Sequence, residues 1–417
     1  MQYFSVADAQ ACILQHTQRC RHERVALHDS LGRVLAEDVF ANRNHPPYDV
    51  SAMDGYAVRY ADIAHATAEE PVSLGVVDDI RAGAMPKCRV LAGKAARIMT
   101  GAATPEGVDT VIRVEDTEAD DEHQVWIRAI APQGANIRPL GENLRKDTMT
   151  LAKGTTITPG VLAILAMVKQ STVTVYAQPR VAILATGDEL EALDEAMDEE
   201  KIPDANSHAL YAQCKALGIE ATMLGIARDN PIELRAKLAE GMGYDVLLAS
   251  GGVSVGVHDF VRPTLADLGI GMHFWRVAMR PGHPLAFGSH ESGARIFALP
   301  GNPVASMVCF EQFVAPALRT MMGHQQIHRR TVAARLTHDI KDRAGRTHFV
   351  RVTLRQNEHG YSATSTGAQG SGVLMSMAVA QGLLPIPADA TVMHAGDVVN
   401  VQLLQEMEYQ ADAGVEC

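Results

Sequence analysis

The sequence lacks several features that would place a 417-residue chain in a class at once. It has no excess of basic residues, because 37 Lys and Arg stand against 49 Asp and Glu and give a net charge of -12. This balance argues against a general role on nucleic acid or on a membrane surface, so any cationic site must be local. The longest apolar stretch, residues 160–168, is shorter than the roughly 20 residues that cross a bilayer. There is no internal repeat and no low-complexity segment.

Cysteine is sparse and its spacing indicates no site. The six cysteines are scattered and none forms a C-x-x-C pair, so neither a zinc site nor a disulfide framework is supported. The N-terminal segment has no basic stretch followed by an apolar core, which argues against a secretory signal. We therefore expect reduced thiols and a cytoplasmic location.

Three loops rich in glycine or proline, each preceded by an apolar run typical of a strand, are the most informative feature. They are TGDEL (186–190), SGGVSVG (250–256) and LPGNPVAS (299–306). In an open α/β sheet such loops gather at the carboxyl edge of the strands, where ligands bind. Glycine lets the backbone approach a ligand closely, and a following helix N-terminus favours an anion. The sequence therefore predicts a site for a phosphorylated or anionic small molecule.

Four carboxylates accompany these loops, namely Asp188, Glu189, Asp229 and Asp259. Acids beside phosphate-binding backbone are typical of a bridging divalent cation. Each also has a purely structural interpretation. Asp188 and Glu189 can stabilise a helix N-terminus, Asp229 can orient the turn before Asn230, and Asp259 can act as an N-cap while also serving as a ligand.

The pattern of apolar runs divides the chain into parts and predicts a multidomain α/β protein. An elongated N-terminal and linker region (1–45 plus 142–176) flanks a small, mostly β insertion domain (46–141). From 177 to 327 the pattern becomes β-α-β-α, which predicts a doubly wound domain with a mainly parallel sheet and helices on both faces. Residues 328–417 alternate with period two and predict a C-terminal β domain.

Capping signals predict where several helices begin. Ser5 precedes an amphipathic helix over 6–18, and Asn206 or Ser207 can cap a helix that ends at Gly218. Asn230 followed by Pro231 combines an N-cap with an N1 proline, and Pro303 after Asn302 opens another helix.

Motifs along essentially the whole chain resemble those of the molybdopterin molybdenumtransferases, the bacterial molybdenum insertases related to the E domain of gephyrin. The motifs, in the family's order, are PPYDVSAMDGYAVR (46–59), RIMTGA (97–102), NIRPLGEN (136–143), TGDEL, RDNP (228–231), SGGVSVGVHDF, RPGHPLAFG (280–288), LPGNP and TGAQGSG (366–372). The resemblance implies a four-part subunit and a homodimer. It also implies that adenylylated molybdopterin is cleaved to release AMP and that molybdate is placed on its dithiolene, with Mg²⁺ assisting.

The resemblance also implies roles for individual residues. Asp54, contributed across the dimer, would join Glu189, Asp229 and Asp259 as the catalytic acids, and Mg²⁺ would lie on Asp188, Glu189, Asp229 and Asp259. Arg276, Arg280, Arg351 and Ser371 would hold molybdate. The residues expected to bind substrate are Thr100, Thr186, Gly187, Asp188, Ser250, Gly251, Gly252, Ser254, Gly256, Arg276, Arg280, His283, Pro300, Gly301, Asn302, Pro303, Arg351 and Ser371.

For several of these residues the local sequence alone supports a purely structural role. Asp54 before a glycine forms a simple turn, and the hydroxyls of Thr100 and Ser371 suit turn hydrogen bonds. Arg276, Arg280 and His283 would by default form a solvated basic face. Arg with hydroxyls and backbone amides nevertheless suits a tetrahedral dianion. No Cys or Ser has a base partner at local spacing, so we expect no covalent nucleophile.

The sequence departs from the family in places that bear on the anion site. Arg276, Arg280 and His283 stand where the family usually has lysines, and Asn143 replaces a carboxylate. Ala305 replaces a serine, and Val50 stands where asparagine is frequent. These changes motivate an alternative, a non-catalytic or specialised paralogue that carries molybdenum cofactor to a client molybdoenzyme. An enzyme that forms adenylylated molybdopterin is a third hypothesis, against which the extra terminal domains argue.

Overall fold

The computed structural model describes residues 3–121, 123–252, 261–358 and 360–405. Contacts divide the chain into two compact units. Unit 1 consists of Met1–Ala36, Gly154–Thr158 and Thr172–Cys417, and unit 2 of Glu37–Lys153 and Pro159–Ser171. Each unit has its own sheets and its own apolar core.

Unit 2 is built around a six-stranded sheet in the order β7-β4-β6-β5-β9-β8. The mostly β character expected for this part of the chain is confirmed. Their alternating side chains form one core around Tyr56 and Ile112 and another around Ala57 and Ile98, because successive residues of a strand face opposite sides. The elements of this sheet and its connections are β4 (Gly55–Val58), α2 (Tyr60–Ile63), β5 (Val72–Ile80), β6 (Lys94–Ile98), β7 (Thr110–Arg113), η2 (Val114–Asp116), β8 (Thr117–Asp121) and β9 (Gln124–Ile127).

The segment that follows this sheet pairs with the segment that precedes it. In unit 2, β10 pairs with β3 and β11 with β2, and in unit 1, β12 pairs with β1. Pro159 opens α3 at its first position, where its missing N–H costs no helical hydrogen bond. The bounds are β1 (His22–Ala26), η1 (Leu27–Ser30), β2 (Val39–Phe40), β3 (Val50–Ser51), β10 (Ile137–Arg138), β11 (Met149–Leu151), α3 (Pro159–Met167) and β12 (Thr172–Tyr176).

A second six-stranded sheet, in the order β16-β13-β17-β21-β20-β18, forms the centre of unit 1. The first four strands run parallel. Strand β20 pairs antiparallel with both β21 and β18, so β20 alone runs in the opposite direction and the expected mainly parallel sheet is confirmed. The register places Ala185 beside Ser250 and Ser250 beside Leu299. The carboxyl ends of β13, β17 and β21 therefore finish side by side. The bounds are β13 (Val181–Thr186), β16 (Ala221–Ala227), β17 (Val246–Ser250), β18 (Gly271–Phe274), β20 (Ala286–Ser289) and β21 (Arg295–Leu299).

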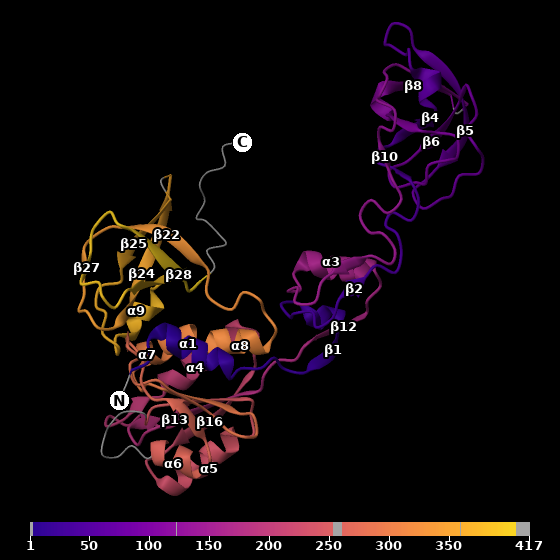
Figure 1. Cartoon of the computed structure of the whole chain (residues 1–417). Helices are drawn as coiled ribbons and strands as arrows, with labels where there is room; N and C mark the ends of the chain where they lie inside the picture. Colours follow the sequence, from indigo (N-terminus) through magenta and orange to yellow (C-terminus); the bar gives the residue numbers. More distant parts are fainter. Residues whose placement is uncertain (1–2, 122, 253–260, 359, 406–417) are drawn as a thin grey trace. The chain divides into compact units, whose positions relative to one another are not determined.

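Helices cover both faces of this sheet (Figure 1). Ile183 packs on one face with Leu210 of α4 and with α7 and α1, whereas Leu184 packs on the other with α5 and α6. Because both faces are covered, the central strands are continuously apolar rather than alternating. The helices are α1 (Val6–Gln15), α4 (Ala205–Ala216), α5 (Pro231–Gly241), α6 (Val261–Asp267), α7 (Pro303–Cys309), the π-helical η3 (Phe310–Val314) and α8 (Ala315–Met321).

The predicted helix starts are mostly confirmed, with one correction that matters for the site. Ser5 caps α1, and Asn230 caps α5 ahead of an N1 proline. However, α4 is capped by Asp204, whose carboxylate accepts a hydrogen bond from the Ser207 N–H at 3.1 Å, and not by Asn206 or Ser207. Asn206 lies in the first turn, where its side chain is free for other contacts. Both α1 and α4 end before the expected residue, at Gln15 and Ala216.

The C-terminal part of unit 1 is a closed β barrel. Its strands pair in the cycle β24-β25-β22-β28-β26-β24, which leaves no free edge among the five. Val350, Val352 and Val401 fill its interior. The short strand β19 (Met279–Arg280) pairs with β24 and ties the barrel to the loop after β18. The bounds are β22 (Thr331–Leu336), β23 (Ile340–Lys341), β24 (Thr347–Asn357), β25 (Gly360–Ser365), α9 (Leu374–Ala378), β26 (Gly382–Ile386), β27 (Val392–Met393) and β28 (Val398–Leu403).

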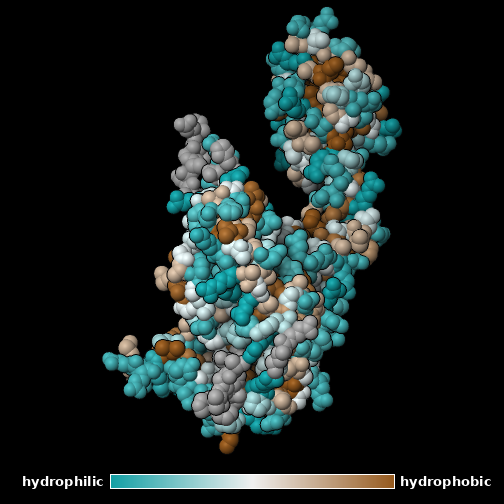
Figure 2. Space-filling view, turned by 60° about the vertical axis from the view of Figure 1, so that its left-hand side comes forward, coloured by the Kyte–Doolittle hydropathy of each residue, from teal (hydrophilic) through white to brown (hydrophobic). Residues whose placement is uncertain are grey.

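The surface is mainly polar on the face shown in Figure 2, where apolar residues form scattered patches rather than a continuous band. Within the described residues, no helix has the length and apolarity needed to cross a membrane.

Candidate functional site

The three predicted loops meet at the carboxyl edge of the parallel sheet, where Asn206 ties two of them together. Its side-chain amide donates to Ser250 Oγ at 2.9 Å and to the Gly301 carbonyl at 2.7 Å. Thr186 Oγ1 in turn donates to the Ser250 carbonyl at 3.4 Å. Thr186 and Ser250 are both buried, so these contacts fix the base of the loops.

The glycines of the second loop are required by close packing and not by flexibility alone. Gly251 has φ +98°, and a Cβ on it would lie 2.4 Å from the Thr186 carbonyl oxygen. A Cβ on Gly252, at φ +60°, would lie 2.4 Å from Val261 Cγ2. Only glycine fits such an approach at positive φ. Gly301 of the LPGNP loop lies close as well, with a Cβ position 3.7 Å from Gly251 Cα.

The first loop is joined to the loop after β16 by hydrogen bonds from Asp229 and Arg228. The Asp229 N–H donates to Asp188 Oδ1 at 3.0 Å, which joins TGDEL to the loop after β16. Arg228 Nη1 donates to the Leu190 carbonyl at 2.6 Å and to the Asp188 carbonyl at 3.4 Å. The side chains of Asp188, Glu189 and Asp229 are exposed. A carboxylate at this edge can therefore reach a ligand, while the hydrogen bonds of Arg228 fix the backbone of the loop.

These loops enclose a cavity of about 410 Å³. The volume lies in the range of small-ligand pockets. Of the predicted site residues, it brings together Thr186, Glu189, Ser250, Gly251, Gly252, Pro300, Gly301 and Asn302. Pro303 follows directly as the first residue of α7. Of the other predicted members of this region, Gly187, Asp188 and Asp229 do not line the cavity, and Ser254, Gly256 and Asp259 lie outside the described residues.

The predicted basic residues lie on the turn between β18 and β20, which also borders the cavity through Pro284. The turn is packed against α7, because a Cβ on Gly282 at φ +106° would lie 2.5 Å from Cys309 Sγ. Arg280 forms an ion pair with the buried carboxylate of Asp342. His283 bonds through Nδ1 to the Val277 carbonyl at 3.0 Å, and burial lowers its pKa, so it is neutral at pH 7. Arg276 is half-buried on the same turn.

Arg351 is a charged group inside the protein, on barrel strand β24. It is fully buried, and its Nε and Nη2 donate to Ser376 Oγ at 3.2 Å and to the Gly370 carbonyl at 3.1 Å. Within the part of the chain that the structure describes, Nη1 has no hydrogen-bond partner and no carboxylate pairs with this guanidinium. Burial lowers the pKa of Arg351 to about 10, which still leaves it charged at neutral pH. A buried cation of this kind favours an anionic ligand.

Ser371 directly follows Gly370, whose carbonyl accepts a hydrogen bond from Arg351. The Ser371 carbonyl accepts a hydrogen bond from the Val304 N–H at 3.2 Å, so this barrel loop rests on the start of α7 beside the LPGNP loop. Unit 1 therefore brings the predicted residues of the TGAQGSG motif next to those of LPGNP.

Asp54 and Thr100 contact each other within unit 2. Asp54 Oδ1 accepts hydrogen bonds from the Thr100 N–H at 2.7 Å and from Thr100 Oγ1 at 2.8 Å. These two bonds, the backbone one foremost, lower the pKa of the exposed Asp54 carboxyl. Asp54 is thus held ionised by Thr100. The turn interpretation of both residues is compatible with this geometry.

Sequence reasoning missed three residues that organise these sites. The sequence predicts Asn206 only as a helix cap and contains Arg228 only as part of the RDNP motif, and it gives no indication of Asp342. The signal for Asn206 is its place two residues after another capping residue, Asp204, which leaves the Asn206 side chain available. Asp342 gave no local signal, because its partner Arg280 is distant in sequence.

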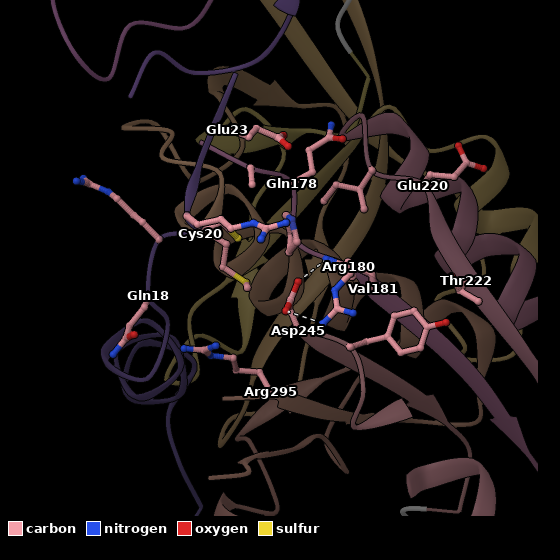
Figure 3. Close-up of a pocket in the computed structure, with 17 residues that line it drawn as sticks. Gln18, Cys20, Glu23, Gln178, Arg180, Val181, Glu220, Thr222, Asp245 and Arg295 are labelled. Carbon is pink, nitrogen blue, oxygen red and sulfur yellow. Dashed lines mark hydrogen bonds and ion pairs between the residues drawn. The ribbon is translucent and has the colours of Figure 1, made fainter. Parts of the chain in front are cut away.

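A larger cavity, of about 910 Å³, lies at the opposite edge of the same sheet, where β13 begins (Figure 3). Several of its charges are already neutralised in pairs. Arg180 pairs with Asp245 at 3.3 Å, Glu23 with Arg33 and Glu220 with Lys215. It holds none of the glycine-rich loops. Cavity size alone therefore does not identify the site, and the convergent loops at the carboxyl edge are the better candidate.

The buried cysteines are unsuited to nucleophilic chemistry. Burial raises the pKa of Cys214 to about 12, and it raises the pKa of Cys309 as well. Because the thiolate is the reactive form, these two thiols are poorly suited to act as nucleophiles.

Three family models match the chain in succession. They are the MoeA N-terminal region (domain I and II) over residues 4–168, the "Probable molybdopterin binding domain" over 182–320 and the MoeA C-terminal region (domain IV) over 333–404. The second model covers the sheet and loops that form the carboxyl-edge cavity.

Curated relatives and a solved structure agree with these models along nearly the whole chain. A molybdopterin molybdenumtransferase of Bacillus subtilis is 37% identical, covering 92% of this chain and 90% of that protein. One from Nostoc sp. is 38% identical, with coverage of 91% and 88%. A crystal structure of the molybdopterin biosynthesis MoeA protein of Pyrococcus horikoshii OT3 superposes with a TM-score of 0.83 at 29% identity, covering 96% of this chain and all of that one. On these grounds, the chain belongs to the molybdopterin molybdenumtransferase family, transferases of molybdenum cofactor biosynthesis.

Proposed function

We propose that this protein inserts molybdate into adenylylated molybdopterin and releases AMP in a Mg²⁺-dependent reaction. The observation that carries the proposal is the convergence of TGDEL, SGG and LPGNP on one cavity of about 410 Å³ at the carboxyl edge of the sheet. The cavity is lined by Gly251, Gly252 and Gly301, whose backbone suits a phosphate, by the exposed carboxylate of Glu189, and by Pro284 of the basic turn.

The phosphate part of the substrate would lie against the loops that Asn206 joins. Gly251, Gly252 and Gly301 leave the backbone uncovered there, because none of them carries a side chain over its amide. The start of α7 at Pro303 adds the partial positive charge of a helix N-terminus. These groups would bind and orient the pyrophosphate without being consumed.

The carboxylates at this edge fit Mg²⁺ that is bound together with a phosphate. Asp188, Glu189 and Asp229 supply only hard oxygen donors, which Mg²⁺ prefers. Within the described residues, they do not close into a group of three carboxylates within 4.8 Å of one another. Mg²⁺ usually takes one or two carboxylates and completes its shell with water and substrate phosphates, so an open set is the expected arrangement. When bound, the ion would neutralise charge that develops on the phosphate.

Molybdate would be recognised by the basic groups beside the cavity. Arg351 has a buried Nη1 without a partner among the described residues, and the loop carrying Ser371 rests on the start of α7. Arg280 would contribute a second charge, which Asp342 holds in place. Neutral His283 would act as a hydrogen-bonding group rather than a cation. A guanidinium with hydroxyl and amide donors suits a tetrahedral dianion.

The proposal includes further properties that rest on the family resemblance. They are a cytoplasmic homodimer in which Asp54 of one protomer serves the α/β domain of its partner, and contact with other proteins of cofactor synthesis or with a client molybdoenzyme. Sedimentation equilibrium tests the dimer. Mixing an Asp54→Asn variant with a Glu189→Gln variant tests the shared site, because mixed dimers would recover one intact site.

The direct test is release of AMP from adenylylated molybdopterin by the purified protein. We expect release to require Mg²⁺, to be stimulated by molybdate, and to fall strongly in Glu189→Gln. A Cys214→Ala variant is the matched control and should keep its activity, because that thiol is buried on α4 away from the loops. Absence of AMP release under all conditions would contradict the proposal.

The carrier hypothesis makes the opposite prediction, namely tight pterin binding without metal-dependent release. Asn143, where the family has a carboxylate, is the residue that motivates it. Its side chain is exposed and its N–H donates to the His45 carbonyl at 3.0 Å, so an Asn143→Asp change should not disturb the fold. A large gain of turnover in Asn143→Asp would favour a carrier with a degenerated site, whereas an unchanged rate would favour the insertase.

A further inference from the structure

Three metal-binding side chains gather where α1 packs on the edge strand β18. Cys12 lies in the last turn of α1, and His16, four residues later, is the residue that caps the helix C-terminus, which places the two on the same side of the helix end. His273 reaches them from β18. One donor atom from each residue lies within 4.8 Å of those of the other two, and all three side chains are half-buried. This is the only such group of His, Cys, Asp or Glu within the described residues.

Each imidazole is oriented by a hydrogen bond of the kind that supports metal ligands. His16 Nδ1 lies 2.8 Å from the Cys12 carbonyl, which can only accept, so Nδ1 carries the proton and the lone pair is at Nε2. His273 Nε2 lies 2.9 Å from Ser289 Oγ on the neighbouring strand β20. Partners of this type fix the ring orientation and raise the basicity of a ligating histidine.

A bound cation would hold Cys12 as the thiolate, because a coordinating thiol is deprotonated outright. The two rings lie 3.8 Å apart between centroids in the metal-free state, so small side-chain rotations must accompany binding.

We propose that Cys12, His16 and His273 form a zinc site that fastens α1 to β18. One thiolate and two imidazoles match the donors of Zn²⁺ and differ from the oxygen donors that Mg²⁺ takes. A water completes the tetrahedron, as in three-ligand zinc sites. The site is separate from the carboxyl-edge cavity and shares none of its residues. A search of the sequence for C-x-x-C pairs does not find this site, because it has a single cysteine and its third ligand, His273, is distant in sequence.

Cobalt tests the proposal, since Co²⁺ occupies zinc sites and reports its ligands by absorption. Titration of the full-length, reduced protein in excess Mg²⁺ should saturate at one Co²⁺ per chain, with a thiolate-to-cobalt charge-transfer band that Zn²⁺ abolishes. Cys12→Ser should lose this band, while Cys20→Ser, which changes another half-buried cysteine, should keep it. Ser289→Ala should weaken binding about 10-fold by freeing the His273 ring.

Thermal unfolding gives an independent measurement of the same site. Zn²⁺ should raise the unfolding temperature of the wild-type protein and of Cys20→Ser, and should leave Cys12→Ser and His273→Gln unchanged, because metal that binds only the native state stabilises it. Two results would overturn the proposal. One is a charge-transfer band that survives Cys12→Ser, and the other is no band in the wild-type protein, which would leave the contact as an aromatic stack only.

Discussion

Substitution of Gly251 by alanine probes the convergence of loops on which the proposed site depends. The added Cβ would lie 2.4 Å from the Thr186 carbonyl oxygen and 2.8 Å from Thr186 Oγ1, at a backbone φ of +98°. Thr186 cannot retreat, because it is the last residue of β13 and only 3% exposed. The loop itself must therefore move.

The expected cost combines two contributions. A positive φ costs an L-residue about 1–2 kcal/mol. Forcing an extra methyl into a packed site costs about 1–3 kcal/mol more. Together they predict that Gly251→Ala lowers the stability of unit 1 by about 2–5 kcal/mol and also weakens substrate binding, because the loop leaves the cavity wall.

Gly301→Ala is the matched control. Its Cβ would meet only Gly251 Cα, at an ordinary 3.7 Å, and its φ is not positive. We expect its stability to stay within about 0.5 kcal/mol of wild type. Because Gly301 also lines the cavity, the new methyl should weaken binding of the adenylylated pterin without loosening the fold.

Hydrogen exchange of the amides of β13 and β17 measures the stability, and equilibrium dialysis of the pterin measures the binding. A loss of about 3 kcal/mol corresponds to roughly 100-fold faster exchange in Gly251→Ala. Wild-type exchange together with wild-type affinity in Gly251→Ala would refute the reasoning. So would equal destabilisation by Gly301→Ala.

Three further predictions concern groups around the sites. Arg228→Lys should lower turnover about 10-fold or more with little change in the free energy of unfolding, because the Nη1 that donates to the Leu190 and Asp188 carbonyls is lost from an exposed loop; measurement of kcat and of urea unfolding on the same variant checks this. Thr100→Val should raise the pKa of Asp54 towards its ordinary value, since one of two hydrogen bonds that lower it disappears; carboxyl NMR titration measures this, and an unshifted titration would contradict the assignment. Burial and Arg319 lower the pKa of His324 from 6.5 to about 4 in the folded protein. As the pH falls below 6.5, the unfolded chain binds a proton before the folded protein does, so the free energy of unfolding decreases until the pH reaches about 4. Urea unfolding should show a loss of about 2 kcal/mol between pH 7 and pH 5 that His324→Gln abolishes.

The central sheet could be predicted from the sequence because its cause is local. Strands covered on both faces are continuously apolar, and the runs before TGDEL, SGGVSVG and LPGNP have that composition. Right-handed crossover connections then bring their ends to one edge. The position of the three loops followed from these two facts.

Other features could not be predicted because they depend on distant partners. Closure of the barrel rests on the pairing of β24 with β26, and no residue of either strand specifies that partner locally. Arg351 occupies a strand position that by sequence could face solvent, yet it is fully buried. The group of Cys12, His16 and His273 joins the two ends of a long chain segment.

The error at α4 has a specific cause. Asp204, Asn206 and Ser207 are all good capping residues, so composition could not decide among them. The structure uses Asp204 as the cap and thereby leaves the Asn206 amide for Ser250 and Gly301. Because Asp204 caps the helix, Asn206 is left to connect two loops of the candidate site.

A structure of the protein with adenylylated molybdopterin and Mg²⁺ tests the central claim most directly. We predict the pyrophosphate against Gly251, Gly252 and Gly301, with the cation on carboxylates of the TGDEL loop. Pyrophosphate in the larger cavity at the opposite edge, among Arg180, Arg295 and their neighbours, would contradict the account.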